Sequence, residues 1–101
     1  MSVYLIVNSD VKDREAHKDY LARVPALVAK HGGEYLARGG AFEVLEGDWQ
    51  PARLILFRFP DRASVKALFS DPDYLPLKKL RQSIAATQIV MLDGVDQAGA
   101  A

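Results

Sequence analysis

Residues 32–49 read GGEYLARGGAFEVLEGDW, and two glycine pairs divide this segment into elements. Gly32-Gly33 predicts the end of a helix, because glycine readily adopts the left-handed conformation that residues with a Cβ avoid. Residues 34–38 then alternate as a strand does. The segment therefore predicts a helix-to-strand junction at its first glycine pair.

The second glycine pair predicts a tight turn. Gly39-Gly40 allows positive φ at both central positions, and a turn there would fold residues 41–45 back onto the strand as a hairpin. The alternation places Tyr35 and Arg38 on opposite faces of that strand. A bulge at the glycines, which would shift the pairing, is the alternative.

Length and composition limit the classes of protein. The 101 residues suffice for one domain, which we expect at residues 1–95 with a flexible tail at 96–101. Thirteen basic and thirteen acidic side chains cancel, so the chain lacks the positive field that attracts nucleic acid. Cysteine is absent, which fits a reducing compartment, and apolar runs are far shorter than the about 20 residues of a membrane span. The N-terminal run is typical of a strand rather than a signal peptide. We expect a cytoplasmic protein that binds neither nucleic acid nor membranes.

The remaining elements follow from periodicity and capping signals. We expect strands at 3–7, 53–59 and 87–92, and helices in three segments. The first begins at Asp10 or Asp13 and ends near His31, with a bend or break at Pro25. The second follows Pro60-Asp61, and the third restarts at Asp71-Pro72.

The element order predicts the fold. Strand, helix, two strands, helices and strand with right-handed crossovers give a ferredoxin-like βαββαβ arrangement, an α+β fold with a four-stranded antiparallel sheet of order 4-1-3-2. The helices would cover one face, yet strands 3–7, 53–59 and 87–92 are apolar on both. We therefore expect a homodimer in which two sheets pack face to face.

Motifs spread over about residues 3–95 carry a family resemblance. They are Gly32-Gly33 with Tyr35, Arg38-Gly39-Gly40, Glu46-Gly47 with Trp49, Phe59-Pro60, and Tyr74 with Arg81. Together they resemble the family DUF1330, small bacterial proteins of unknown function within the dimeric α/β-barrel group. The resemblance implies the ferredoxin-like fold and a dimer that forms an α/β barrel, but no established activity. Related barrels include cofactor-free monooxygenases, isomerases of small lactones and haem-dependent enzymes, an analogy at the level of fold.

Common catalytic and metal-binding motifs are missing. The sequence has no Gly-rich phosphate loop, H-E-x-x-H, G-x-S-x-G or EF-hand pattern. His17 and His31 lack the i, i+4 spacing that would direct both to one metal, so we expect no metal site and no cofactor. His31 suits the negative end of a helix dipole and is interpreted as a helix-end residue.

Three residues are candidates for catalysis. Arg38 would orient an anionic oxygen, unless it forms an ion pair with Glu43 or Glu34. Glu46 would move a proton if buried, or else cap its loop. His17 is the other candidate for moving a proton, since it could reach the edge of a pocket, and its alternative is a solvated or partly packed helix residue.

Four residues are candidates for ligand binding. Arg81 would hold an anionic oxygen, or else form an ion pair across the dimer. Tyr20, Trp49 and Tyr74 would form walls, and Trp49 is alternatively an anchor against the partner subunit. Two functions from different classes stay open: a cofactor-independent enzyme acting on a small organic acid or aromatic compound, and a non-catalytic homodimeric module for ligand binding or assembly.

Overall fold

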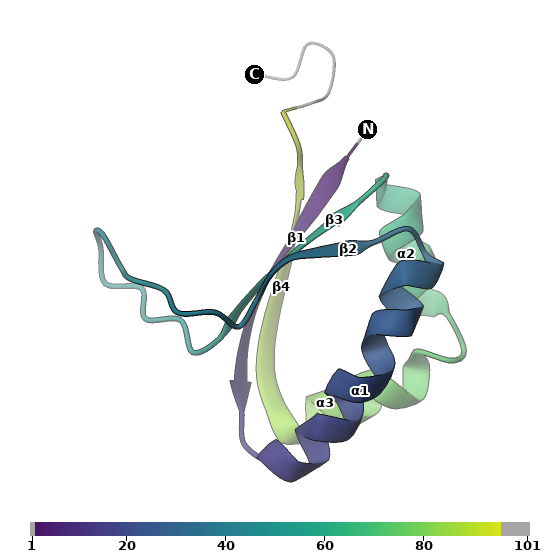
Figure 1. Ribbon diagram of the computed structural model, residues 1–101, viewed down its shortest axis with the longest axis horizontal. Helices are drawn as coiled ribbons and strands as arrows, with labels where there is room; N and C mark the ends of the chain where they lie inside the picture. Colours follow the sequence, from purple (N-terminus) through teal and green to yellow (C-terminus); the bar gives the residue numbers. More distant parts are fainter. Residues whose placement is uncertain (1, 96–101) are drawn as a thin grey trace.

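A computed structural model describes residues 2–95, so the predicted tail at 96–101 lies outside the described residues. The chain forms one four-stranded antiparallel sheet with three helices on one face (Figure 1). The elements are β1 (Val3–Val11), α1 (Arg14–Lys30), β2 (Glu34–Arg38), β3 (Leu54–Phe59), α2 (Arg62–Ser70), α3 (Leu75–Ile84) and β4 (Ala85–Asp93). The strand order β2-β3-β1-β4 is the predicted one, and the sheet of the single chain is open.

The first helix begins and ends where the sequence indicates. The Asp13 carboxylate accepts a hydrogen bond from the backbone N–H of Ala16 at 3.1 Å, and His31 is the C-terminal cap. Pro25 lies inside α1 without dividing it, so the helix is continuous. Gly32 has a φ of +79°, as predicted for the residue that ends a helix.

Gly33 has a different role from its neighbour. It is not among the residues of positive φ. A Cβ at this position would lie 2.5 Å from the Phe59 ring and 2.8 Å from a methyl of Val28. The absence of a side chain at Gly33 therefore lets α1 pack closely against the sheet, and the residue is not needed for a left-handed turn conformation.

The predicted hairpin is wrong. β2 pairs with β3, whereas residues 40–53 form a loop whose residues 41–50 are exposed and contain no strand. Tyr35 packs on Phe57 of β3 with ring centroids 4.5 Å apart. Of the second glycine pair only Gly39 has positive φ.

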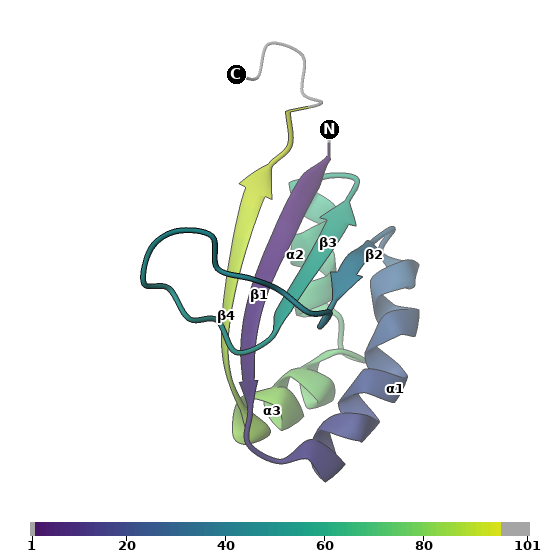
Figure 2. The same cartoon turned by 60° about the vertical axis from the view of Figure 1, so that its left-hand side comes forward.

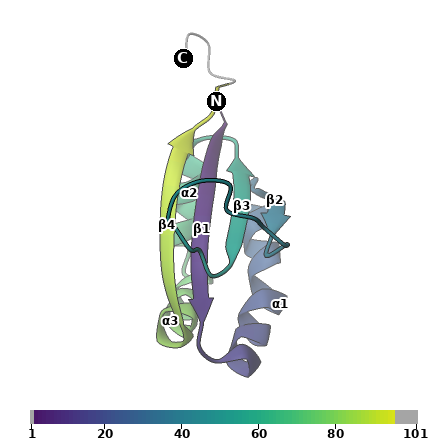
Figure 3. The same ribbon diagram turned by 90° about the vertical axis from the view of Figure 1, so that its left-hand side faces the viewer.

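The long loop leaves the sheet on the side opposite the helices. Figure 1 shows this loop and the helices on opposite sides, and Figures 2 and 3 show the loop in front of the sheet. This side of the sheet, which we call the helix-free face, carries apolar side chains from all four strands. They are Tyr4, Ile6, Leu36, Leu54, Leu56, Val90 and Leu92.

A bulge in β2 changes the predicted face of one strand. Tyr35 pairs with Phe57 and Arg38 pairs with Ile55, so Leu36 is the extra residue. Because a bulge shifts the alternation by one residue, Tyr35 and Arg38 share the helix-covered face instead of lying on opposite faces. The predicted alternation is wrong from Ala37 onward.

The third helix starts later than predicted. Asp71 forms a turn, in which its carboxylate accepts from the N–H of Asp73 at 2.9 Å and its carbonyl accepts from the N–H of Tyr74 at 2.9 Å. The helix α3 therefore begins at Leu75, and Pro76 rather than Pro72 occupies its first turn. Within residues 2–95, no helix is both long and apolar enough to span a membrane.

Candidate functional site

A cavity of about 60 Å³ lies between the helix-covered face of the sheet and the helices; we call it the inner chamber. Its walls are mostly apolar and aromatic, including Leu5, Phe57 and Phe69. The ionisable groups among its lining residues are His17, Tyr20, Tyr35, Arg38, Arg53, Tyr74 and Arg81. No carboxylate is among the described residues that line it.

A wider cleft of about 500 Å³ adjoins the inner chamber; we call it the outer cleft. Ser9, His17, Leu21 and Arg53 border both spaces. Tyr20, Tyr74 and Arg81 line the inner chamber only. The site thus has a small inner part and a large outer part with shared walls.

Arg81 is the charged group deepest in the site. It lies on α3, is 7% exposed, and its Nε has no hydrogen-bond partner among the described residues. Leaving a buried guanidinium N–H without an acceptor costs free energy. The unpartnered donor therefore indicates a place for an acceptor supplied from outside the chain.

The hydroxyls of Tyr20 and Tyr74 lie 3.3 Å apart within hydrogen-bond distance. Burial, with the neighbouring Tyr74 second, raises the pKa of Tyr20 far above its usual range. Tyr20 is therefore a neutral hydroxyl at physiological pH. The sequence predicted both tyrosines as walls of a site, and they do line the inner chamber together.

His17 borders both spaces on the first turns of α1. It is buried and stacks on Tyr20 with ring centroids 5.8 Å apart. Burial, followed by the positive charges of Arg53 and Arg38, lowers its pKa. The imidazole is therefore neutral at pH 7 and able to accept a proton.

Arg38 makes no ion pair among the described residues. Its guanidinium donates to the carbonyl of Leu21 at 2.9 Å and lies over the Tyr35 ring at 4.6 Å. The alternative of a pair with Glu34 or Glu43 is not formed: Glu34 is bound to Arg58, and Glu43 lies in the exposed loop at 40–53. The cationic group thus keeps N–H donors at the cavity edge.

Arg53 is a site residue that the sequence analysis missed. It precedes β3, and its pKa is lowered by burial and by the nearby Arg38. The backbone of Arg53 is held beside β1, because its carbonyl accepts a hydrogen bond from the Ser9 N–H at 2.9 Å. The signal was present, since Arg53 is in phase with Ile55 and Phe57 and so belongs to the helix-covered face.

Gly39 makes room for Arg53. Gly39 has a φ of +68°, and a Cβ there would lie 2.5 Å from the Arg53 Nε. The end of β2 and the start of β3 are tied by the hydrogen bond from Gly39 N–H to the Leu54 carbonyl at 2.8 Å. A residue with a side chain would push the guanidinium from its position between the two spaces.

Two predicted site residues lie elsewhere. Glu46 and Trp49 are in the loop at 40–53 and line neither the inner chamber nor the outer cleft. Trp49 is 57% exposed. The structure therefore brings together His17, Tyr20, Arg38, Tyr74 and Arg81 and leaves the other two apart.

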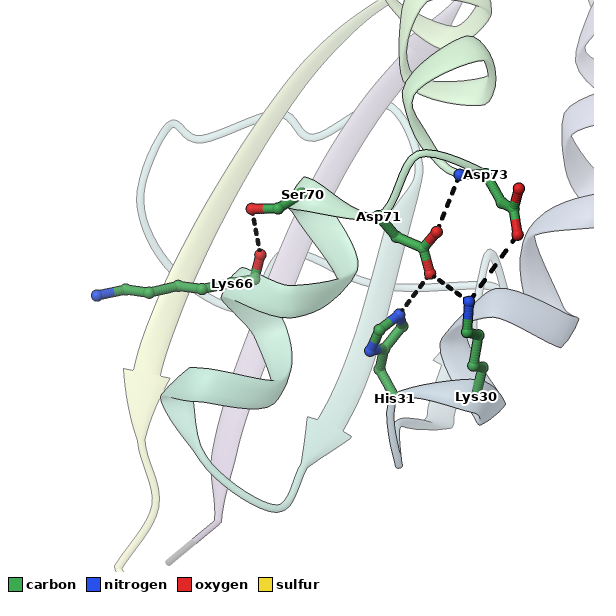
Figure 4. Close-up of polar contacts among 6 residues, drawn as sticks. All are labelled: Lys30, His31, Lys66, Ser70, Asp71 and Asp73. Atoms are coloured by element: carbon green, nitrogen blue, oxygen red, sulfur yellow. Dashed lines mark hydrogen bonds and ion pairs between the residues drawn. The ribbon is translucent and has the colours of Figure 1, made fainter.

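A polar cluster fixes the helices that carry the site. Lys30 and His31 each contact the buried Asp71 carboxylate at 2.8 Å, as Figure 4 shows. These bonds, Lys30 first, lower the pKa of Asp71. Asp71 thus joins the end of α1 to the turn before α3. It lies three residues before the buried Tyr74. The interpretation of His31 as a helix-end residue is confirmed.

The βαββαβ order and the open antiparallel sheet define a ferredoxin-like protein with a cavity between sheet and helices. Residues 2–95 match the family described as a domain of unknown function, DUF1330, and the chain belongs to that family. No curated protein matches the sequence.

Solved structures with the same fold have low sequence identity. RPA0582, a protein of unknown function from Rhodopseudomonas palustris, has a TM-score of 0.79 and 17% identity over 93% of this chain and 82% of its own. A dimeric ferredoxin-like protein of unknown function from Jannaschia sp. CCS1 has a TM-score of 0.70 and 13% identity over 93% and 100%. SnoaB, a cofactor-independent oxygenase from Streptomyces nogalater, has a TM-score of 0.64 and 12% identity over 97% of both chains. At these identities the likeness establishes the fold alone.

Proposed function

We propose that the protein is a cofactor-independent enzyme that acts on a small organic acid held in the inner chamber. One observation carries the proposal: Arg81 is buried and its Nε is unpartnered in a chamber lined by no carboxylate of residues 2–95. A carboxylate or enolate oxygen would accept from this guanidinium and compensate its charge.

The volume of the inner chamber favours an acid over an aromatic ring. An engineered apolar cavity of roughly 150 Å³ binds benzene. The inner chamber has less than half of that, about 60 Å³. A carboxylate with a short chain fits without rearrangement, whereas a ring requires wall side chains to move.

The polar groups are suited to proton transfer. His17 takes a proton from a carbon next to a carbonyl group, and the electron pair moves onto the carbonyl oxygen to form an enolate. Arg81, Arg38 and the tyrosine hydroxyls donate hydrogen bonds to that oxygen. The proton returns from His17 to complete the cycle. Glu46 and Trp49, in the loop at 40–53, take no part in this scheme.

The comparisons support the proposal at the level of fold. SnoaB is described as a cofactor-independent oxygenase, so a related scaffold carries out chemistry without a cofactor. The identity of 12% transfers neither its substrate nor its catalytic residues.

We further propose that two copies pair through their helix-free faces to form the dimeric barrel, in the cytoplasm. Val90 and Leu92 are 58% and 55% exposed on that face, and apolar surface of this kind favours burial. The similar Jannaschia protein is described as dimeric. Trp49, exposed on the adjacent loop, is the proposed anchor on the partner subunit.

A non-catalytic ligand-binding module is the second candidate. The observation that favours it is that the His17 ring makes no hydrogen bond within residues 2–95, whereas a general base is usually oriented by a third group. The two candidates agree on the ligand and differ on whether a proton is transferred.

The test combines binding with proton exchange. Pyruvate, 2-oxobutanoate or acetoacetate should raise the midpoint temperature of thermal unfolding. A ligand at 100 times its Kd adds about 2.7 kcal/mol to the free energy of unfolding. Arg81→Met should remove that rise, while Arg62→Met, which loses a surface ion pair with Asp93, should keep it. Proton NMR in D₂O should show exchange of the hydrogens next to the carbonyl, lost in His17→Gln.

Each outcome assigns the function. Binding with exchange supports the enzyme, and binding without exchange supports the module. If none of the acids binds, or if Arg81→Met binds them as tightly as the wild type, the inner chamber is not the site and the proposal is wrong.

A further inference from the structure

The charges around the two connected spaces do not balance. Among the described residues that line them, Arg14, Arg38, Arg53 and Arg81 have no carboxylate partner. The single lining carboxylate, Asp10, is already bound to Lys12 at 2.7 Å. Lys18, the other lining cation, is bound to Glu15 at 2.8 Å. One negative charge on a ligand would therefore leave most of this positive charge uncompensated.

The unpaired donors fall into two sets. Arg81 lines the inner chamber only, as do Tyr20 and Tyr74. Arg53 borders both spaces, and Arg14 lines the outer cleft only. Leu21, which also borders both spaces, and Phe57 of the inner chamber provide apolar walls. A ligand that satisfies both sets has a polar group at each end and an apolar middle.

We infer that the site takes a short dicarboxylic acid, one carboxylate at Arg81 in the inner chamber and the other at Arg53 in the outer cleft. This inference rests on the proposed function, because it names the substrate class of the same site. The inner chamber, at about 60 Å³, admits one carboxylate and a carbon or two. The remaining carbons and the second carboxylate occupy the outer cleft of about 500 Å³.

Such a ligand passes His17, which borders both spaces. The carbons between the two carboxylates would therefore be the ones nearest the imidazole. A second carboxylate outside also explains why Gly39 is required, since it keeps the Arg53 guanidinium at the boundary of the two spaces. A monocarboxylate would make no use of this position.

The test compares two acids of equal carbon chain, butanoate and butanedioate, with inorganic phosphate as a compact multivalent anion. Affinities are measured by isothermal titration calorimetry at constant ionic strength, because surface charges are screened by salt. The variant is Arg53→Gln, and the control is Arg23→Gln, which removes one positive charge from α1 at an exposed residue paired with Asp19. Arg53 is only partly buried, so its variant should fold.

Wild type and Arg23→Gln should bind butanedioate at least about tenfold more tightly than butanoate, the effect of one charge-assisted hydrogen bond. Arg53→Gln should reduce this preference to about twofold or less while the butanoate affinity stays nearly unchanged. Equal affinities for the two acids in the wild type, or a preference that survives in Arg53→Gln, would overturn the inference.

Phosphate distinguishes a two-ended site from a general anion site. If phosphate binds as tightly as butanedioate and loses affinity equally in Arg53→Gln, the inference of two separated carboxylates is wrong. In these cases the proposed function still stands if butanoate binds and Arg81→Met abolishes that binding. If neither acid binds to the wild type, the inference is wrong, and binding of pyruvate, 2-oxobutanoate and acetoacetate decides whether the proposed function fails with it.

Discussion

The two faces of the sheet are built from the same strands, yet they differ in what they leave unsatisfied. Along β1 the side chains of Val3, Leu5 and Val7 are buried under the helices, and those of Tyr4 and Ile6 between them are only partly buried on the helix-free face. The covered face contains unpaired arginines, and the helix-free face contains uncovered apolar side chains. Each face thus holds the type of group that is usually found on the other.

The comparison indicates that different kinds of partner would stabilise the two faces. A buried cation without a counterion is stabilised by an anion, and an exposed apolar face is stabilised by another apolar surface. The single chain supplies neither. The covered face is therefore the candidate for a small ligand, and the helix-free face is the candidate for a second copy.

The largest expected effect is at the junction that closes the covered face. Gly33→Ala places a Cβ 2.5 Å from the Phe59 ring, and overpacking of this kind costs about 2–3 kcal/mol. We expect the free energy of unfolding in urea to fall by that amount. Gly40→Ala, whose Cβ would meet no atom within 4 Å, is the control and should change stability by less than about 0.5 kcal/mol. Equal losses in both variants would contradict the packing role of Gly33.

The next largest effect is expected on dimer formation through the helix-free face. Val90→Lys places a charge on that face opposite Ile6, and we expect the dimer Kd to rise at least about tenfold, or about 1.4 kcal/mol. Sedimentation velocity over a range of protein concentrations would measure it. Gln88→Lys, on the same face and strand but at an already polar position, is the control. A wild type that is monomeric at all concentrations would show that this face is not an interface between copies.

A smaller effect of opposite sign is expected at Arg81. Without ligand, Arg81→Met removes a buried unpaired charge and keeps much of the side-chain volume, so stability should rise by about 1 kcal/mol. The thermal midpoint would rise by several degrees in a domain of this size. A loss of stability instead would mean that the guanidinium has a partner within the folded protein. The same variant should lose acid binding, so stability and function change in opposite directions.

The smallest effect is the pH dependence from His17. Its pKa is lower in the folded chain than its usual 6.5, so protonation favours the unfolded chain. Stability from this group should be complete above about pH 6.5, fall as pH drops toward the folded pKa, and level off below it. The difference in thermal midpoint between wild type and His17→Gln, measured from pH 5 to 8, isolates this contribution. A difference that does not vary with pH would contradict a buried neutral imidazole.

Much of the fold follows from signals that act locally. Asp13 and Asp61 cap their helices as predicted, because each carboxylate bonds a backbone N–H three residues later. Apolar runs then indicated the four strands, and the element order with right-handed crossovers predicted their order in the sheet. The predicted strand order placed β2 beside β3, whereas the local turn signal at Gly39-Gly40 indicated pairing with residues 41–45. Local signals could not decide between these partners, because the pairing that forms includes contact between the distant rings of Tyr35 and Phe57.

The candidate site was predicted in part for the same reason. His17, Tyr20 and Arg81 lie on predicted helices, and Tyr74 is the residue before α3. All four line the inner chamber. Arg38 reaches the inner chamber only because the bulge at Leu36 shifts the alternation of side chains along β2. No residue in this strand predicts such a bulge. Their functional roles stay predictions until ligands are tested.

The strand order also constrains how the chain folds. β1 lies between β3 and β4, and Val3 pairs with Asp93 from the far end of the described chain. Contacts between such distant segments close large loops, so folding should be slow compared with a helical bundle of equal length. In any state in which β1 has joined β3 but not β4, one edge of the central strand is open to hydrogen bonding by another chain. We therefore expect that pairing of β4 with β1 closes an edge through which folding chains could aggregate.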